Sequence, residues 1–304
     1  MISSINKQQL VRERLARELL VLYLNGMNHL RPVQQYAEGL GVGRGTVQSA
    51  FQELKAMGAI TLNACGARGT FLDKVDRRKL FDACGYGELI CLMPLDANHH
   101  YRSLATGIYE SISARELPIH ILFARGSRNR VKILVRQKCD FAIMSLLAYE
   151  TAVNVRKDAI ESVGKIGEYP GDLGVVTREE RPYVPGETKV AFDDHSYDQC
   201  ALHALFSMRD EEPAEYLNVQ LADMVRQGRV EAAICDRSSL GSHAGLRFHP
   251  LELSEAARVK LRTAVAVIRQ GDASMRELLL SVLEPDTVSQ VQEQVLAGER
   301  LVKY

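Results

Sequence analysis

Residues 30–72 have the sequence LRPVQQYAEGLGVGRGTVQSAFQELKAMGAITLNACGARGTFL. Apolar residues first recur with the spacing i, i+3, i+4, i+7, which predicts a short helix, and Pro32 is favoured in its first turn. Gly41 ends this helix, and the same spacing predicts a second helix that begins near Arg44 and ends at Gly58. Two short strands joined by a glycine-containing turn follow. The stretch therefore predicts two helices and a hairpin, in that order.

A further helix over residues 7–24 precedes this stretch and completes a winged helix-turn-helix domain over residues 1–74. The outward side of its last helix is polar. Arginine can bond guanine bidentately, glutamine can bond adenine, and small hydroxyl groups suit phosphates or thymine methyl groups. An arginine in the hairpin turn can reach a phosphate or a minor groove, and an ordinary solvated surface is the alternative for all of these side chains. The candidate contacts to double-stranded DNA are Arg44, Thr46, Gln48, Ser49, Arg68 and Thr70.

Residues 30–72 resemble the winged helix of the GntR-type regulators. The resemblance is carried by LGVGRGTV at residues 40–47 and by GTF at residues 69–71. It implies the fold but not the base specificity, because Gln34 and Gln48 stand where that family usually has arginines. Gly43 stands where Ser or Thr often caps the recognition helix, so we expect a weaker cap.

The net charge of zero conceals an asymmetry along the chain. Residues 1–79 hold 12 of the 38 Lys and Arg but 6 of the 38 Asp and Glu, which leaves 26 basic and 32 acidic residues in the rest. A basic segment on a larger acidic body suggests that only the first part meets a polyanion.

From residue 87 onward, apolar strand segments alternate with amphipathic helices. This order predicts parallel sheets with helices on their faces, and therefore an α/β fold. We expect a charged linker over residues 75–86 and a second domain over residues 87–304. The predicted strands lie at 89–93, 119–123, 141–144, 189–192, 216–220, 232–235 and 263–268, and the predicted helices lie at 101–114, 128–137, 197–206 and 222–227, with two more helices at the C-terminus.

The two halves of this region resemble the type 2 periplasmic-binding-protein fold, which senses effectors in LysR-type regulators. The sequences MPL at residues 93–95 and YRSLATG at residues 101–107, together with the winged helix, make the whole chain resemble the YhfZ regulators. The resemblance implies an N-terminal winged helix-turn-helix joined to a two-lobed α/β domain, and DNA-binding transcription regulation. It implies no particular effector.

Ligands in such sheets bind beyond the carboxyl ends of the strands, where helix N-termini favour anions. Hydroxyl groups, helix-capping positions and arginines recur there, which predicts a small anionic metabolite as the effector. Each side chain could equally serve as a helix cap or lie in solvent. The candidate ligand-binding residues are Pro94, Tyr101, Ser127, Arg128, Asn129, Ser145, Asp194, Ser196, Tyr197, Asp236 and Arg237.

The sequence predicts no enzyme, catalytic residue, cofactor or metal site. It lacks the G-x-S-x-G, H-E-x-x-H and P-loop patterns, and no acidic residue stands at a diagnostic spacing from His99, His100 or His195. A fused pyridoxal-phosphate enzyme would need a longer chain and a Schiff-base lysine motif.

We also expect a cytoplasmic protein with no membrane segment, because the chain has no signal peptide, no long apolar run and only scattered cysteines. One short recognition helix reads few bases, so a homodimer or higher oligomer is expected. The alternative to a ligand-controlled regulator is a ligand-free DNA-binding scaffold whose second domain serves only oligomerisation.

Overall fold

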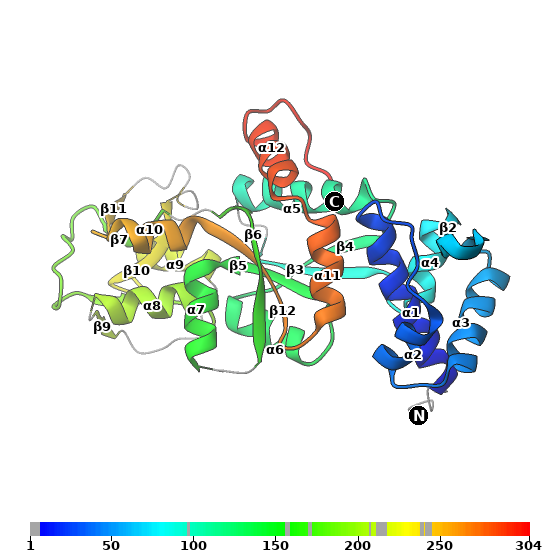
Figure 1. Cartoon of the computed structure of the whole chain (residues 1–304). Helices are drawn as coiled ribbons and strands as arrows, with labels where there is room; N and C mark the ends of the chain where they lie inside the picture. The colour runs from blue at the N-terminus through cyan, green and yellow to red at the C-terminus, as the bar shows by residue number, and fades with distance from the viewer. Residues whose placement is uncertain are drawn as a thin grey trace. The chain divides into compact units, whose positions relative to one another are not determined.

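The computed structural model describes residues 7–95, 98–155, 159–169, 172–206, 208–210, 218–237, 240 and 245–304 (Figure 1). These residues form two compact units. Unit 1 holds the residues up to Leu89 together with Ser111–His120 and Asp272–Glu284, and unit 2 holds Ile90–Glu110, Ile121–Gly271 and Pro285–Tyr304.

Unit 1 contains the predicted winged helix-turn-helix. The core of this domain lies where α1 packs on α3, with Leu15, Leu19, Val47 and Leu54 fully buried. These residues are buried together because three to four residues make one helical turn, so their spacing places them on one side of each helix. The elements are α1 (Lys7–Leu24), α2 (Val33–Leu40), α3 (Arg44–Ala56), β1 (Ile60–Ala64), the 3-10 turn η1 (Gly66–Arg68), β2 (Thr70–Val75) and α4 (Arg77–Ala83).

A late helix, α11 (Ala273–Val282), completes unit 1 by packing against α1 (Figure 1). The buried Ser111 hydroxyl, near the end of α5 (His99–Ser113), donates a hydrogen bond of 2.7 Å to the Val282 carbonyl oxygen. Thus α11 packs on α1 and the end of α5 bonds to the last residue of α11, an arrangement of distant segments that local sequence patterns do not encode.

Unit 2 is built on two sheets. The first has the strand order β4-β3-β5-β12-β6, in which β3 and β5 are parallel and β12 is antiparallel to both of its neighbours. Its strands and further helices are β3 (Leu89–Met93), β4 (Ile119–Phe123), α6 (Ser127–Val135), β5 (Phe141–Ser145), α7 (Leu146–Val155), β6 (Ile160–Glu168), β12 (Thr263–Arg269) and α12 (Pro285–Leu296).

The second sheet has the order β11-β7-β10-β8-β9 and is buried on both faces. Val175 and Ile234 pack in one core cluster, whereas their neighbours Val176 and Cys235 pack in the cluster on the other side. Alternate residues of a strand face opposite ways, so an unbroken apolar strand requires cover on both faces. The elements are β7 (Leu173–Arg178), β8 (Lys189–Ala191), α8 (Tyr197–Leu205), β9 (Arg209–Asp210), α9 (Asn218–Arg226), β10 (Ala232–Asp236), β11 (Leu246–Pro250) and α10 (Glu255–Arg262).

The chain leaves the first sheet after β6 and returns to it at β12. These two strands pair with each other, and Glu168 lies opposite Thr263 at the point of departure and return. We call the part built on the first sheet lobe 1 and the part built on the second sheet lobe 2. The two-lobed α/β domain that the sequence predicts is confirmed.

Several elements differ from the sequence prediction. The prediction of a strand at 216–220 is wrong for residues 218–220, which form the start of α9. Residues 216 and 217 lie outside the described part of the chain. The sequence prediction omits α7 because it follows β5 without a turn residue, in an apolar run that has no clear period. It omits β6, in which Gly164 and Gly167 weaken the strand pattern, and also β7, β11 and α10.

No helix among the described residues is long and apolar enough to cross a membrane.

Candidate DNA-binding face and ligand crevice

The outward side of α3 presents polar side chains in one stripe. Arg44, Gln48 and Gln52 are all exposed and follow one another at intervals of four residues. Four residues make slightly more than one helical turn, so these side chains line up along the helix. Thr46 is half-buried and lies off this stripe, two residues from Arg44. The stripe offers one guanidinium group and two amides, which match the donors and acceptors of base edges.

Ser49 lies on the side of α3 that faces α1. Its hydroxyl accepts a hydrogen bond of 2.8 Å from the side-chain amide of Gln8, and it is half-buried. The same amide donates to the carboxylate of Glu53, which lies four residues after Ser49 on α3. The structure therefore ties Ser49 to the packing of α3 on α1 and not to the exposed stripe.

The hairpin turn holds Arg68 exposed at its tip. Below it, the ring of His29 lies 4.8 Å from that of Phe71, and its Nε2 lies 3.2 Å from the Arg68 carbonyl oxygen. The next residue, Gly69, has a φ of +90°, and a Cβ there would lie 2.7 Å from His29 Nε2. Only glycine suits this backbone and this close contact. His29 and Gly69 together fix the turn that presents Arg68.

A groove of about 530 Å³ separates α3 from the hairpin. Gln48 and Gln52 line it from the helix, and Arg68 and Thr70 line it from the hairpin. The structure thus brings three of the predicted DNA contacts to one groove, and it leaves Arg44, Thr46 and Ser49 outside that lining.

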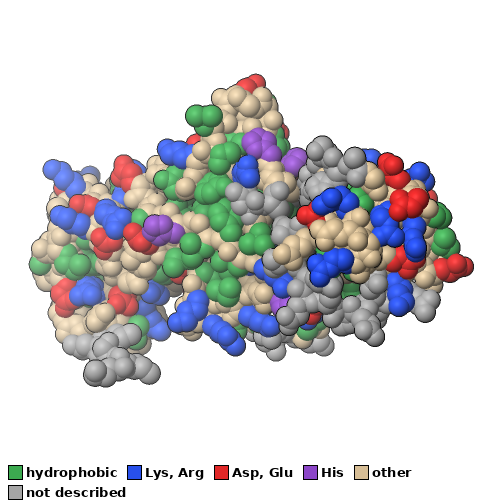
Figure 2. Space-filling model, turned by 180° about the vertical axis from the view of Figure 1, so that it is seen from behind, with side chains coloured by type: hydrophobic (Ala, Val, Ile, Leu, Met, Phe, Trp, Pro, Cys, Tyr) green, Lys and Arg blue, Asp and Glu red, His purple; other side chains and the backbone are tan. Residues whose placement is uncertain are grey.

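Sequence reasoning missed Arg31, which also lines the groove. Its guanidinium group forms an ion pair with Glu18 and lies 4.5 Å from the centre of the Tyr36 ring. The sequence signal for Arg31 was its position directly before Pro32, where α2 begins beside the recognition helix. On the face shown in Figure 2, described basic and acidic side chains are interspersed, so the positive charge of residues 1–79 forms no continuous patch on that face.

The second candidate site is a crevice between the two lobes of unit 2. Its walls follow the carboxyl ends of β3 and β4 in lobe 1 and of β8 and β10 in lobe 2, which is where the sequence places a ligand. Five of the predicted ligand-binding residues line it, namely Pro94, Tyr101, Ser127, Ser196 and Asp236.

The other six predicted residues lie outside this lining. Arg128 lies over the Tyr197 ring, and its Nη1 is 3.9 Å from a carboxylate oxygen of Asp194. Arg237 lies over the Phe248 ring, with its guanidinium group largely exposed. Asn129 is a half-buried residue of α6, and the buried Ser145 hydroxyl donates to the Asp198 carboxylate.

The loops that the sequence selects line the crevice, but several of the lining side chains are not among the predicted residues. Arg125 and Asp193 stand in two of the loops that it selects, and Asp198 and Gln199 follow in the first turn of α8. Arg130 and Tyr169 lie further from any loop signal, one inside α6 and one after β6. The lining residues that sequence reasoning missed are Leu95, Arg125, Gly126, Arg130, Tyr169, Leu173, Asp193, Asp198, Gln199 and Leu261.

Direct hydrogen bonds join the two lobes across the crevice. Arg125 of lobe 1 donates to both carboxylate oxygens of Asp193 in lobe 2, over 3.0 and 3.3 Å. Beside this ion pair, the main-chain N–H of Tyr197 donates to the Ser127 hydroxyl over 2.8 Å. The Arg128 main-chain N–H donates to the His195 carbonyl oxygen over 2.9 Å. The lobes are therefore closed on each other by groups of the protein itself.

Gly126 allows this close approach. It has a φ of +63°, and a Cβ on it would lie 2.3 Å from the His195 carbonyl oxygen. Any side chain at this position would push the two loops apart, so the glycine is a steric requirement of the closed lobes.

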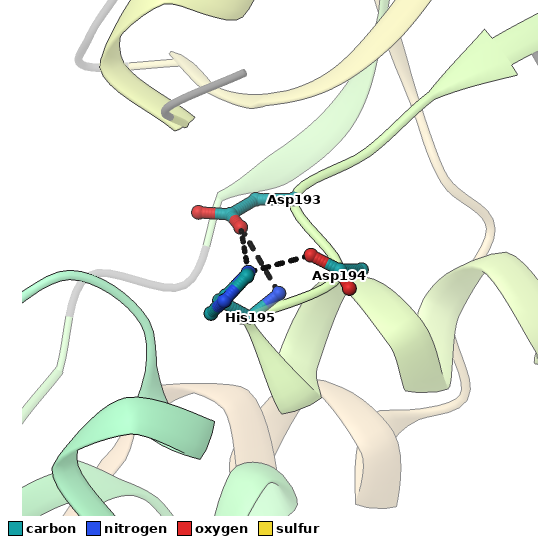
Figure 3. A group of neighbouring side chains, drawn as sticks. All are labelled: Asp193, Asp194 and His195. Carbon is teal, nitrogen blue, oxygen red and sulfur yellow. Dashed lines mark hydrogen bonds and ion pairs between the residues drawn. The ribbon is translucent and has the colours of Figure 1, made fainter. Parts of the chain in front are cut away.

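Asp193, Asp194 and His195 form the one group in the described part of the chain that could supply three metal ligands (Figure 3). Their ligand atoms lie within 4.8 Å of one another. However, the buried Asp193 carboxylate already accepts two hydrogen bonds from Arg125 and one from the His195 main-chain N–H. A metal would have to displace this arginine, so the donor set fits an ion pair between the lobes better than a cation site.

Burial dominates the electrostatics of the crevice. It raises the pKa of Asp198 to about 6, although hydrogen bonding from Ser145 and the charge of Arg130 act in the opposite direction. Burial likewise raises the pKa of Tyr169 to about 12, and it raises the pKa of Tyr101 well above the ordinary value. A carboxyl with a pKa of about 6 and two protonated phenols thus line the same crevice.

The closed crevice has a volume of about 70 Å³. A water molecule takes up roughly 30 Å³ of liquid, so this space suits a few waters or one small functional group. Sites for whole metabolites are about 300–1,000 Å³, and such a ligand requires the lobes to separate.

Family comparisons agree with this architecture. Residues 76–304 match the family described as the YhfZ C-terminal domain, and residues 26–72 match a helix-turn-helix domain family. The chain is 25% identical over 306 residues to the uncharacterized protein YhfZ of Escherichia coli, with 99% of this chain and 98% of that protein covered.

Solved structures give the same result for the fold. The crystal structure of YhfZ from Shigella flexneri superposes with a TM-score of 0.60 at 24% identity, covering 75% of this chain and 98% of that one. The periplasmic VFT2 domain of BvgS from Bordetella pertussis gives 0.52 at 15% identity, covering 73% of this chain and 98% of that one. Unit 2 therefore has the periplasmic-binding-protein-like fold, and the chain belongs to the YhfZ family.

Proposed function

We propose that this protein is a transcription regulator that binds double-stranded DNA through its winged helix and responds to a small molecule in the crevice of unit 2. The observation that carries the proposal is the stripe of Arg44, Gln48 and Gln52 on α3, beside the exposed Arg68 of the wing. These residue types read base edges and bind phosphates. We place its action in the cytoplasm, and binding rather than catalysis is the activity that we propose.

We further propose that it binds as a homodimer or higher oligomer. Since α3 has 13 residues and one such helix reaches few base pairs, two copies are needed for a specific operator. A two-fold dimer requires a palindromic site with half-sites about 34 Å apart.

The test is selection of operator sequences from random duplex DNA with the full chain, followed by footprinting. We expect an enriched palindrome and protection of both half-sites. Binding that shows no preference over competitor DNA would contradict specific regulation, and a single asymmetric half-site at saturation would contradict the dimer.

The control by a small molecule depends on opening the lobes. A ligand can shift an equilibrium between open and closed lobes only by its difference in affinity for the two states. A tenfold change in operator affinity corresponds to about 1.4 kcal/mol of coupling, which a few charge-assisted hydrogen bonds can supply. The sequence predicts an anion for this role; that charge is not part of the present proposal, because carboxylates outnumber arginines in the lining.

One observation favours a second function, the ligand-free scaffold. Arg125 and Asp193 close the crevice without any ligand, and about 70 Å³ remains between the lobes. A scaffold would hold unit 2 closed under all conditions. Small-angle X-ray scattering of the full chain, with and without a panel of metabolites, separates the two functions, because a sensor changes its radius of gyration with some ligand and a scaffold with none.

A further inference from the structure

The charges that line the crevice are unequal. Its charged side chains are two arginines, Arg125 and Arg130, and three carboxylates, Asp193, Asp198 and Asp236. All three carboxylates come from lobe 2, whereas both arginines come from lobe 1. The lining therefore carries one more negative charge than positive when its carboxylates are ionised, and lobe 2 presents the negative side.

One of these carboxylates is already paired within the protein. Asp193 holds the guanidinium group of Arg125 through two hydrogen bonds, and its side chain is fully buried. This pair is neutral as a whole, so it contributes no net charge to the remaining space. Lobe 2 thus closes on a cation that lobe 1 supplies.

Arg130 is then the one remaining arginine of the lining, against the two other carboxylates. It is 3% exposed, and it donates to the carbonyl oxygens of Ala124 and Ile143, so lobe 1 holds it in place. Asp198 and Asp236 are 7% and 8% exposed. An anion placed here would meet two buried carboxylates against one arginine, and repulsion between like charges is strong where water is excluded.

The rest of the lining also suits a cation. The rings of Tyr101 and Tyr169 meet edge to face with their centres 5.3 Å apart, and both line the crevice. The faces of aromatic rings attract cations, and carboxylates accept the three N–H donors of an ammonium group. An ammonium group is also about the size of a water molecule, so it fits the space that the closed lobes leave.

We propose that the crevice binds a small molecule that carries an ammonium group, with Asp198 and Asp236 as the partners of that group. This inference rests on the proposed function, because it takes the crevice to be a ligand site, and it replaces the anion that the sequence predicts. The ligand is an amine if the ammonium group is its only charge, and a zwitterion if a carboxylate on it also reaches Arg130.

The test measures the melting temperature of the full chain in the presence of matched salts. Methylammonium chloride, sodium chloride and sodium formate are compared at equal ionic strength. We expect methylammonium to raise the melting temperature by about 2 °C over sodium chloride, which is the size expected at several times the dissociation constant for a domain of this size. Formate should raise it no more than sodium chloride does.

A second set of probes separates the two ligand types. Alanine, lactate and 2-amino-1-propanol have the same carbon skeleton, but alanine is a zwitterion, lactate an anion and 2-amino-1-propanol a cation. Stabilisation by alanine and 2-amino-1-propanol alike identifies an amine site, and stabilisation by alanine alone identifies a zwitterion site. Stabilisation by lactate alone overturns the proposal.

The variants Asp236→Asn and Asp198→Asn should each abolish the methylammonium shift. Asp223→Asn is the matched control, because Asp223 lies on α9 of the same lobe, about half exposed, where it pairs with Arg226. This variant changes the charge of lobe 2 by the same amount and should retain the full shift. Circular dichroism establishes that each variant is folded. If one of the two variants fails to fold, the other still tests the proposal.

The proposal is overturned if neither methylammonium nor alanine gives a shift, if formate gives a larger shift than methylammonium and alanine do, or if both aspartate variants keep the shift. Operator selection with the same protein separates this result from the proposed function. A regulator that binds its operator but shows no ammonium shift refutes only the ligand class, whereas an ammonium shift without operator binding refutes only the regulator.

Discussion

Replacing Asp198 by asparagine should stabilise the protein at neutral pH. Asp198 is buried in the first turn of α8, and burial raises the pKa of its carboxyl from 3.8 to about 6. A raised pKa means that folding favours the protonated carboxyl. The stability that the protonated form contributes is therefore fully present below about pH 3.8, and it is lost as the pH rises through about 6.

The size of the effect follows from the shift. Each unit of pKa corresponds to about 1.4 kcal/mol, so a shift of roughly two units makes the ionised carboxylate cost about 3 kcal/mol in the folded state. Asparagine cannot ionise, and its carbonyl oxygen can still accept the hydrogen bond that Ser145 donates to Asp198. The difference in unfolding free energy between Asp198→Asn and the parent should grow by about 2 kcal/mol from pH 4.5 to pH 7.5, in favour of the variant.

Urea unfolding followed by far-ultraviolet circular dichroism at several pH values measures this difference. Any constant offset from the substitution itself cancels, since only the change with pH matters. Asp223→Asn, which removes an exposed carboxylate, should show no comparable trend. A difference between Asp198→Asn and the parent that stays flat with pH, or that favours the parent as the pH rises, would refute the assignment of a buried, destabilised carboxylate.

Three further predictions concern the DNA-binding face and the lobes. Arg44→Ala should cost roughly 1–3 kcal/mol of operator affinity and relax specificity at one base pair, as measured by mobility shift with a set of operator variants. Arg68→Ala should weaken binding evenly on all sequences and reduce the slope of log affinity against log salt by about one; wild-type binding by both variants would contradict the assigned face. Gly126→Ala should hold the lobes apart, because its Cβ would lie 2.3 Å from the His195 carbonyl oxygen, and an unchanged radius of gyration in X-ray scattering would show that the closed contact is not required.

The sequence was sufficient to predict elements whose signals are local. The winged helix was predictable because its apolar residues recur at helical spacing and Gly41 and Gly58 mark helix ends. The alternation of strands and helices fixed the fold class for the same reason. By contrast, the packing of α11 on α1 joins segments some 250 residues apart, and no local period records such a contact.

In the crevice, too, features set by nearby residues were predictable and features set by distant residues were not. The loops after β3, β4, β8 and β10 were predictable because the carboxyl ends of strands mark ligand sites in this fold class. Which side chains turn inward was not predictable, because that depends on partners in the other lobe. Arg125 and Arg128 stand three residues apart, Arg125 before α6 and Arg128 in its first turn. Asp193 nevertheless holds Arg125 in the crevice, whereas Arg128 lies beside Asp194, outside the lining. Ser127 and Ser196 line the crevice, and their hydroxyls accept hydrogen bonds from main-chain N–H groups at the start of α8, so both also serve the capping role that the sequence offers as the alternative.

The pairing of β6 with β12 makes lobe 2 an insertion between two neighbouring strands of lobe 1. Glu168 and Thr263 lie directly opposite each other in adjacent antiparallel strands, so the segment between them starts and finishes at nearly one point of lobe 1. A two-residue turn can join antiparallel neighbours of this kind. Joining Glu168 to Thr263 through such a turn would preserve every strand of the first sheet and its order. A miniaturised chain made in this way would test whether the DNA-binding unit needs anything from lobe 2.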